Sequence, residues 1–238
     1  SRIRASELLL LDADDETVMK RPDAPDPTAW CIHGTMHQDL PQARCVLHLH
    51  PPYATAIATL ANPEIPPIDQ NTARFYNRVA CDMGYEGMAN SAEEGRRLAG
   101  ILGNKSVMMM GNHGVLVTGP TVAEAFDTMY YLERACQTLV LAYSTGQKLN
   151  RMSDKAAEQT AQDWEGYTDS AYSHFDEMKK IVERDFKKFN RDLSGDRERQ
   201  RDIERQLLHP FRRDEKDPRR PRPGLRRVRH FASPRALC

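Results

Sequence analysis

The feature that most constrains this chain is a short apolar segment, residues 45–50, that ends in a His-x-His pair and runs directly into two prolines. Alternate side chains of a β-strand point to the same face, so a strand here places His48 and His50 on one side, roughly 7 Å apart along the chain. That spacing suits two imidazoles that share one divalent ion. Ligands commonly bind at the ends of buried strands in α/β sheets, so the segment predicts a metal site at a sheet edge.

His113 is the third candidate ligand. It stands between Asn112 and Gly114, directly after the apolar run 107–110, which we expect to be a buried strand. Glycine lets the backbone fold tightly there, so the imidazole projects from the sheet edge. Two histidines from one strand and a third from a neighbouring loop leave a fourth coordination position open, which is the pattern of catalytic zinc sites. The alternative is that all three histidines are structural.

The first 150 residues alternate helix and strand signals. Helices are expected at 29–39, with Thr28 as the cap, and at about 52–60, 92–102 and 122–144. The last two are opened by the capping boxes Ser91–Glu94 and Thr121–Glu124. Strands are expected in 1–12, at 45–50, at 107–110 and at 115–118. A chain of 238 residues with 39% hydrophobic content is long enough to bury a full core. These signals predict one compact α/β domain.

The order and spacing of these residues resemble one known family. The matching features are His48-Leu49-His50, the run Asn112-His113-Gly114-Val115-Leu116, Gly119, and a long helix through Ala125, Glu133 and Arg134. They are similar to the class II aldolase/adducin family over roughly residues 3–149. The resemblance implies an α/β protein with a three-layer α/β/α domain around a central, mainly antiparallel sheet. It also implies a homo-oligomer, usually a tetramer, with active sites near the subunit contacts.

The same resemblance implies a role for the histidines. Active aldolases and epimerases of the family hold zinc or a similar ion with three histidines, which correspond here to His48, His50 and His113. Zinc is therefore the first expectation, with manganese or cobalt as alternatives. The ion polarises the substrate's carbonyl and hydroxyl oxygens and stabilises an enolate. The residues themselves had already pointed to these three side chains.

The chain departs from the family pattern at Ala29. The aldolases carry a glutamate just before a Trp-x-x-His motif, and here Ala29 precedes Trp30-Cys31-Ile32-His33. Loss of a general base lowers rates by about 10²- to 10⁴-fold. The phosphate-binding segments of the aldolases lie ahead of the point where this chain begins. We therefore expect the first strands of the sheet to be missing, and phosphate-sugar specificity is not supported.

Several side chains are candidates for the proton transfer that the missing glutamate performs. His33 lies one turn beyond the position of that glutamate on the same helical face. Asp69 and Gln70 sit where the resembling aldolases place polar groups that reach into a neighbouring subunit's site. Tyr85 and Tyr53 are candidate proton donors. His33, Asp69, Gln70 and Tyr85 are therefore the predicted catalytic residues.

Composition changes after residue 150. Residues 1–150 form the predicted aldolase-like domain, residues 151–195 form a helical extension, and residues 196–238 form a basic tail. We expect the tail to be disordered because it contains few apolar residues. Residues 212–238 contain nine Arg and one Lys against three acids, a net charge of +7 within a formally neutral chain. No aromatic residues interleave with these arginines in a nucleic-acid motif, so we expect a solvated extension and no nucleic-acid partner.

Targeting signals and cysteine usage predict a cytoplasmic protein. No apolar run approaches the roughly 18 residues that a membrane span needs, and the first residues do not form a signal peptide. The five cysteines are scattered and lack C-x-x-C spacing, which is typical of reduced thiols. We therefore expect neither a membrane partner nor a disulfide framework.

Two functions remain open at this point. The first is a metal-dependent lyase that acts on a small carbonyl or hydroxy-acid substrate through a metal-stabilised enolate, by aldol cleavage or decarboxylation. Decarboxylation fits Ala29 best, because loss of CO₂ yields the enolate without a base. The alternative is a non-catalytic adducin-like assembly or binding module that keeps the fold. Ala29 favours this second function, whereas the intact histidine triple opposes it.

Overall fold

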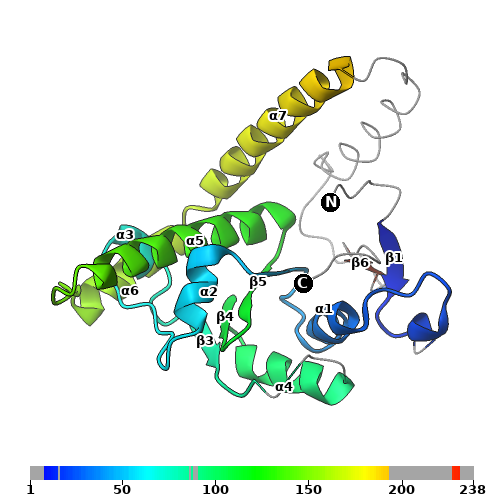
Figure 1. The fold of residues 1–238 in the computed structure, drawn as a ribbon, viewed down its shortest axis with the longest axis horizontal. Coiled ribbons are helices and arrows are strands. Elements are labelled where there is room, and N and C mark those ends of the chain that lie inside the picture. Colours follow the sequence, from blue (N-terminus) through cyan, green and yellow to red (C-terminus); the bar gives the residue numbers. More distant parts are fainter. Residues whose placement is uncertain (1–7, 16, 86, 88–90, 193–226, 231–238) are drawn as a thin grey trace.

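A four-stranded mixed sheet lies at the centre of the chain (Figure 1). The computed structural model describes residues 8–15, 17–85, 87, 91–192 and 227–230. In spatial order the strands are β2 (Cys45–Leu49), β5 (Gly114–Gly119), β4 (Val107–Met110) and β3 (Val79–Asp82). The β2–β5 and β5–β4 pairs are antiparallel and the β4–β3 pair is parallel. The predicted mainly antiparallel sheet is confirmed, and β3 is a strand that the sequence patterns did not indicate.

Helices cover both faces of this sheet, as expected for a three-layer α/β/α domain. α2 (Pro52–Ala58) and α5 (Val122–Ser144) pack on one face, and the short α3 (Gln70–Ala73) lies against α5. α1 (Pro27–Asp39) and α4 (Ala92–Leu102) pack on the other face. Figure 1 shows α5 and α4 on opposite sides of the strands. The sheet is thus buried between two separate hydrophobic cores.

The run of three methionines in β4 divides between these cores. Met109 packs toward α2 and α5, whereas Met108 and Met110 pack toward α1 and α4. None of the three is more than 4% exposed. Successive side chains of a strand point to opposite faces, and a strand covered on both faces has to be apolar on both. The prediction of an internal strand here is confirmed.

Helix starts follow the expected caps with one correction. The hydroxyls of Ser91 and Thr121 accept hydrogen bonds from backbone N–H groups in the first turns of α4 and α5, as predicted. The expectation that Thr28 caps the first helix is wrong. The carboxylate of Asp26 accepts from the N–H groups of Thr28 and Ala29, at 2.9 and 3.1 Å, so α1 begins two residues earlier, at Pro27. Proline fits that first position because its missing N–H would have had no partner within the helix.

Two helices follow the domain. α6 (Asp154–Glu165) and α7 (Thr168–Asp192) are separated by Gly166 and Tyr167. The first turns of α7 pack on α5, where the ring of Phe126 lies 5.3 Å from that of His174 and 5.5 Å from that of Phe175, measured between centroids. Figure 1 shows the rest of α7 extending away from the sheet.

A small second sheet joins sequence segments that are far apart. β1 (Leu9–Asp12) pairs antiparallel with β6 (Arg227–His230), and the one-turn 3₁₀ helix η2 (Val18–Lys20) follows β1. The basic tail that we expected to be disordered lies outside the described residues, apart from β6. The four residues of β6 form a strand, which differs from the expected disorder. The reason is that the backbone of β1 supplies hydrogen-bonding partners that an isolated segment lacks.

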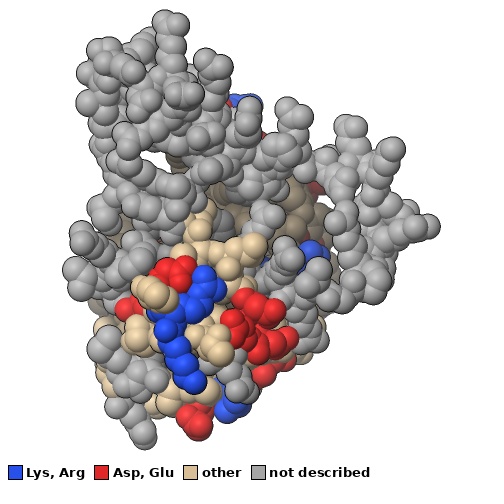
Figure 2. Space-filling view, turned by 90° about the vertical axis from the view of Figure 1, so that its right-hand side faces the viewer, with Lys and Arg blue, Asp and Glu red and all other residues tan. Residues whose placement is uncertain are grey.

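The described surface carries charges of both signs. Figure 2 shows Lys and Arg side chains next to Asp and Glu side chains on the described part of one face. Among the described helices, none is both long enough and apolar enough to cross a membrane.

We predict that the α1–α4 contact depends on Gly95. A Cβ atom at this position would lie 2.4 Å from Thr35 Oγ1 and 2.5 Å from the carbonyl oxygen of Cys31. Gly95→Ala should therefore lower the free energy of unfolding by about 1–3 kcal/mol through overpacking. Gly100 is the matched control on the same helix, because a Cβ there meets nothing within 4 Å. Gly100→Ala should be neutral or raise stability by up to about 1 kcal/mol. Equal stability of the two variants in urea unfolding would contradict the close contact.

Candidate metal centre

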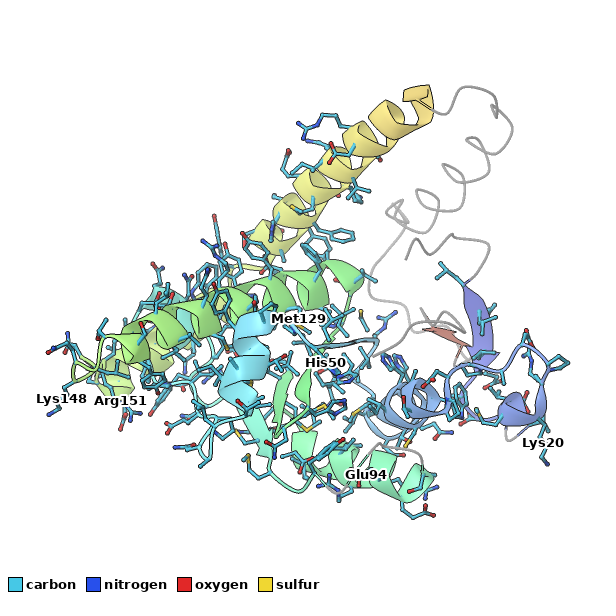
Figure 3. All side chains as sticks on the ribbon, in the orientation of Figure 1. Lys20, His50, Glu94, Met129, Lys148 and Arg151 are labelled. Carbon is cyan, nitrogen blue, oxygen red and sulfur yellow. The ribbon has the colours of Figure 1, made fainter. Side chains whose placement is uncertain are left out.

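Three histidine side chains converge where β2 ends and β5 begins. The antiparallel register places Leu49 opposite Val115, so the residues just beyond each of these strand ends are neighbours. The ring centroids of His48, His50 and His113 lie 4.7–5.1 Å apart. One ligand nitrogen from each ring can be chosen so that all three lie within 4.8 Å of one another. In the view of Figure 3, His50 lies between α2 and α1. The structure therefore brings together the three ligands predicted from the sequence.

His48 has one ring nitrogen engaged and the other without a partner. Its Nδ1 lies 3.0 Å from the carbonyl oxygen of Val115, a contact in which Nδ1 donates a proton and Nε2 keeps its lone pair. That Nε2 is buried and has no hydrogen-bond partner among the described residues. A buried polar atom without a partner is unfavourable by about 1–3 kcal/mol. A metal ion fits this atom, because ligating histidines commonly donate their other ring N–H to a backbone carbonyl.

Burial favours the neutral form of two of these imidazoles. Desolvation, with a smaller contribution from the nearby His113, lowers the pKa of His48 to about 4. Desolvation also lowers the pKa of His113, with a smaller contribution from His50. Neutral imidazole is the form that binds metal ions, so His48 and His113 are ready to ligate at neutral pH.

The turn that carries His113 requires unusual backbone conformations and close contacts. Asn112 has φ = 54°, in the left-handed region that asparagine tolerates better than most residues. A Cβ on Gly114 would lie 2.4 Å from Cδ2 of His50 and 2.7 Å from the carbonyl oxygen of Leu49. The ring of His50 therefore rests directly on the backbone of residue 114. Only glycine leaves room for that ring.

Glu133 fixes the chain just beyond His50. Its two carboxylate oxygens accept hydrogen bonds from the N–H groups of Tyr53 and Ala54, at 3.0 and 2.8 Å. These are the first free N–H groups of α2, whose N-cap residue Pro51 has no capping side chain. A carboxylate at a helix N-terminus also interacts favourably with the helix dipole. The α5 helix thus holds the start of α2, and with it the end of the His-x-His segment.

Tyr85 is the predicted catalytic residue that reaches this group. Its ring centroid lies 5.8 Å from that of His113, and the side chain is 45% exposed. A phenol in this position faces both the histidines and solvent.

Comparison with known proteins agrees with this geometry. A profile of the class II aldolase and adducin N-terminal domain matches residues 1–140. The chain belongs to the class II aldolase and adducin family. Among curated relatives, a Caulobacter vibrioides protein whose name places it among class 2 aldolases is 34% identical over 157 residues, which are 66% of this chain and 60% of that protein. The decarboxylase NovR of Streptomyces niveus is 26% identical over 146 residues, 61% of this chain and 54% of NovR.

A solved structure supports the same assignment. An aldolase II superfamily protein from Pseudomonas syringae aligns with a TM-score of 0.61 and 30% identity, over 66% of this chain and 62% of that one. The chain thus spans less than two thirds of the length of each of these relatives. What they do as whole proteins bears on this member of the family only as a proposal.

The other predicted catalytic residues lie elsewhere in this aldolase-family domain. His33 is half-buried on α1 and does not belong to the group of three histidines that the described residues form. Asp69 is the N-cap of α3 and accepts hydrogen bonds from the N–H and hydroxyl of Thr72, at 2.8 and 2.7 Å. Gln70 is exposed and accepts at its backbone carbonyl from Trp164 Nε1. Roles for Asp69 and Gln70 in a neighbouring subunit's site stay a prediction.

A cavity of about 200 Å³ lies at the opposite end of the sheet. Its wall includes Thr118 near the end of β5, whereas the histidines meet at the start of that strand. Arg74 lies between the rings of Tyr131 and Trp164, at 4.9 and 5.0 Å, and pairs with Asp127 at 2.8 Å. These charges and aromatic rings join α6 to the domain. We therefore place the chemistry at the histidine end.

Two structural features near the site escaped the sequence patterns. The first is Glu133 as the cap of α2. The second is an ion pair between the buried Asp82, at the end of β3, and the partly exposed Arg97 on α4. Partners separated by 15 or 80 residues leave no local spacing signal. The short apolar run Val79–Cys81, followed by the charged Asp82 and then by Gly84, was the available hint of a strand end.

We predict that Gly114→Ala displaces the His50 ring, because the added methyl group would occupy its place. Gly119→Ala is the matched control on β5, since a Cβ there is also crowded, 3.0 Å from the N of Ala125, but lies at the far end of the strand. Both changes should lower the free energy of unfolding by about 1–3 kcal/mol. Only Gly114→Ala should shift the imidazole NMR resonances of His50 in metal-free protein. Unchanged resonances in that variant would show that His50 does not rest on residue 114.

Proposed function

We propose that this chain is a lyase that depends on a divalent metal ion and acts on a small carbonyl or hydroxy-acid substrate. His48, His50 and His113 are its proposed ligands. The observation that carries the proposal is the buried Nε2 of His48, which has no hydrogen-bond partner among the described residues and has two further imidazoles beside it. Three histidines that leave a coordination position open are typical of catalytic metal sites.

We propose zinc as the native ion, with manganese and cobalt as alternatives. Imidazole nitrogens suit zinc and the later transition metals, whereas manganese prefers oxygen ligands. When bound, such an ion supplies a Lewis acid that draws electron density from the substrate's oxygen atoms. The ligand histidines contribute by their fixed orientation, which the Val115 carbonyl and the backbone of residue 114 determine.

Decarboxylation is the reaction we favour. When the bond between the carboxylate carbon and the adjacent carbon of a 3-oxo acid breaks, CO₂ leaves. The electron pair of that bond stays on the adjacent carbon and is delocalised onto the 3-oxo group as an enolate. No base is needed, which agrees with Ala29 at the position of the family's glutamate. A proton must then reach that carbon, and we assign its delivery to Tyr85. The similarity to the decarboxylase NovR supports this choice. Aldol cleavage is the second reaction, and it would require a base such as His33.

The proposed enzyme is a cytoplasmic homo-oligomer, with a tetramer as the expected size. Asp69 and Gln70 then contribute to the site of a neighbouring subunit. Gln70 fits this role better than Asp69, because its side chain is exposed whereas the Asp69 carboxylate caps α3.

We predict that His48→Ala abolishes stoichiometric binding of zinc, while His37→Ala does not. His37 is the matched control, because its Nδ1 also lies against a backbone carbonyl, 2.7 Å from the oxygen of Ala43, but outside the group of three. Loss of one of three ligands should weaken the affinity by at least about 100-fold. Metal analysis after dialysis and isothermal titration measure the effect.

Outcomes of that experiment separate enzyme from assembly module. Wild-type protein that takes up no zinc, manganese or cobalt, and gains no thermal stability when they are added, would contradict the lyase. It would support the adducin-like module. If His48→Ala and His37→Ala lost zinc equally, the loss would come from disturbed folding, and His48 would not be shown to be a ligand.

We further predict that Tyr85→Phe slows product formation without loss of the metal. The zinc-loaded chain is mixed with small 3-oxo acids, and CO₂ release is followed. Removal of the proton donor should lower the rate by about 10²-fold, and the zinc content should stay at the wild-type value. Tyr167→Phe is the control, an exposed tyrosine at the other end of the molecule. An unchanged rate in Tyr85→Phe would remove Tyr85 from the mechanism.

A further inference from the structure

The parallel pairing of β3 with β4 places two functional loops at one edge of the sheet. Asp82 is in register with Met110, so both strands end at the same level. Residues 83–85, the Tyr85 loop, leave β3, and residues 111–113, the His113 turn, leave β4. The proposed proton donor and the third ligand are therefore carried by adjacent strand exits.

The backbones of these two exits touch. The N–H of Gly111 donates to the carbonyl oxygen of Asp82 at 2.6 Å. A Cβ on Gly111 would lie 2.9 Å from that oxygen and 3.3 Å from Cα of Met83. No side chain fits between the two loops, so a displacement of one changes the position of the other.

The side chain of Asp82 also contacts the Tyr85 loop, in addition to the backbone contact between Asp82 and Gly111. It accepts hydrogen bonds from Nη1 and Nη2 of Arg97, at 2.8 and 2.7 Å, and from the N–H of Gly84, at 3.0 Å. Its side chain is only 7% exposed. Arg97 also binds both carboxylate oxygens of Glu94 at 2.7 Å. The hydrogen bonds from Arg97 lower the pKa of Asp82, which keeps this carboxylate charged.

The contribution of such an ion pair to the free energy of unfolding is small, because well-packed apolar residues often stabilise a protein as much. Its effect on the orientation of the carboxylate is more specific. The planar guanidinium binds a carboxylate through two parallel hydrogen bonds, which fixes the orientation of the acid. An oriented Asp82 in turn fixes the N–H of Gly84, the residue before Tyr85.

We infer that Asp82, oriented by Arg97, is a positioning residue that holds the Tyr85 loop against the His113 turn. The tyrosine and the third ligand then face one another across the substrate position. This inference rests on the proposed metal-dependent function, because only an ion and a substrate give that alignment a purpose.

The experiment compares two buried carboxylates that are both paired with arginine. Asp127 is 2% exposed and pairs with Arg74 at 2.8 Å, at the cavity end of the sheet. Asp82→Asn and Asp127→Asn each remove one buried negative charge. Both should lower the midpoint of urea unfolding. Only Asp82→Asn should weaken the binding of Co²⁺, by about tenfold, and change its visible absorption spectrum, as expected when a supporting contact near a metal site is lost.

A further variant tests orientation against charge. Arg97→Lys keeps the positive charge but loses the two-pronged contact. Its affinity for Co²⁺ should fall between those of wild type and Asp82→Asn. Wild-type affinity in Arg97→Lys would mean that charge alone matters, and the positioning role would be overturned.

Hydrogen exchange separates this inference from the proposed function. In metal-free protein the amides of Gly84 and Gly111 should exchange faster in Asp82→Asn than in Asp127→Asn. If the wild type binds no Co²⁺, the proposed function fails, and the exchange rates still decide whether Asp82 holds the two loops. Equal exchange in both variants, or equal effects on Co²⁺ binding, would overturn the inference.

Discussion

The antiparallel register between β2 and β5 is the constraint on which the site depends. It sets Leu49 opposite Val115, which brings the His-x-His segment against the turn that carries His113. A shift by one residue would turn His48 to the other face of the sheet. Such a shift would also move Val46 out of the core that packs on α1 and α4. The same apolar contacts that stabilise the fold therefore align the three imidazoles.

Much of this arrangement was predictable because its signals are local. The His-x-His alternation, the glycine beside His113 and the caps at Ser91 and Thr121 each involve residues within four positions of one another. Local chemistry also explains the error at α1, where Asp26 and Thr28 are both good caps. Asp26 prevails because Pro27 then occupies the first helical position.

The remaining features depend on pairings between distant segments. β3 has four residues and ends in a charge, so it shows too little periodicity to be recognised, and the partner of that charge lies on α4. The approach of Tyr85 to His113 follows only from the parallel β3–β4 register. The tautomer of His48 follows from its contact with the carbonyl of Val115 across the sheet. None of these partners can be identified from spacing along one chain.

Both ends of the sheet bury polar groups, but among the described residues an unpartnered imidazole nitrogen beside two further imidazoles occurs at the histidine end. At the cavity end the buried carboxylate of Asp127 is shared by Arg74 and by Nδ1 of His174, at 2.8 and 2.7 Å, in a contact that fastens α7 to α5. At the histidine end the buried Nε2 of His48 is left without a partner among the described residues. Nη1 of Arg74, at the cavity end, also lacks a partner among the described residues, as does Oγ1 of Thr55. A guanidinium can only donate hydrogen bonds, whereas Nε2 of His48 keeps a lone pair that can bind a cation. The chemical type of the unpartnered atom, and the two imidazoles beside it, therefore distinguish the histidine end from the cavity end.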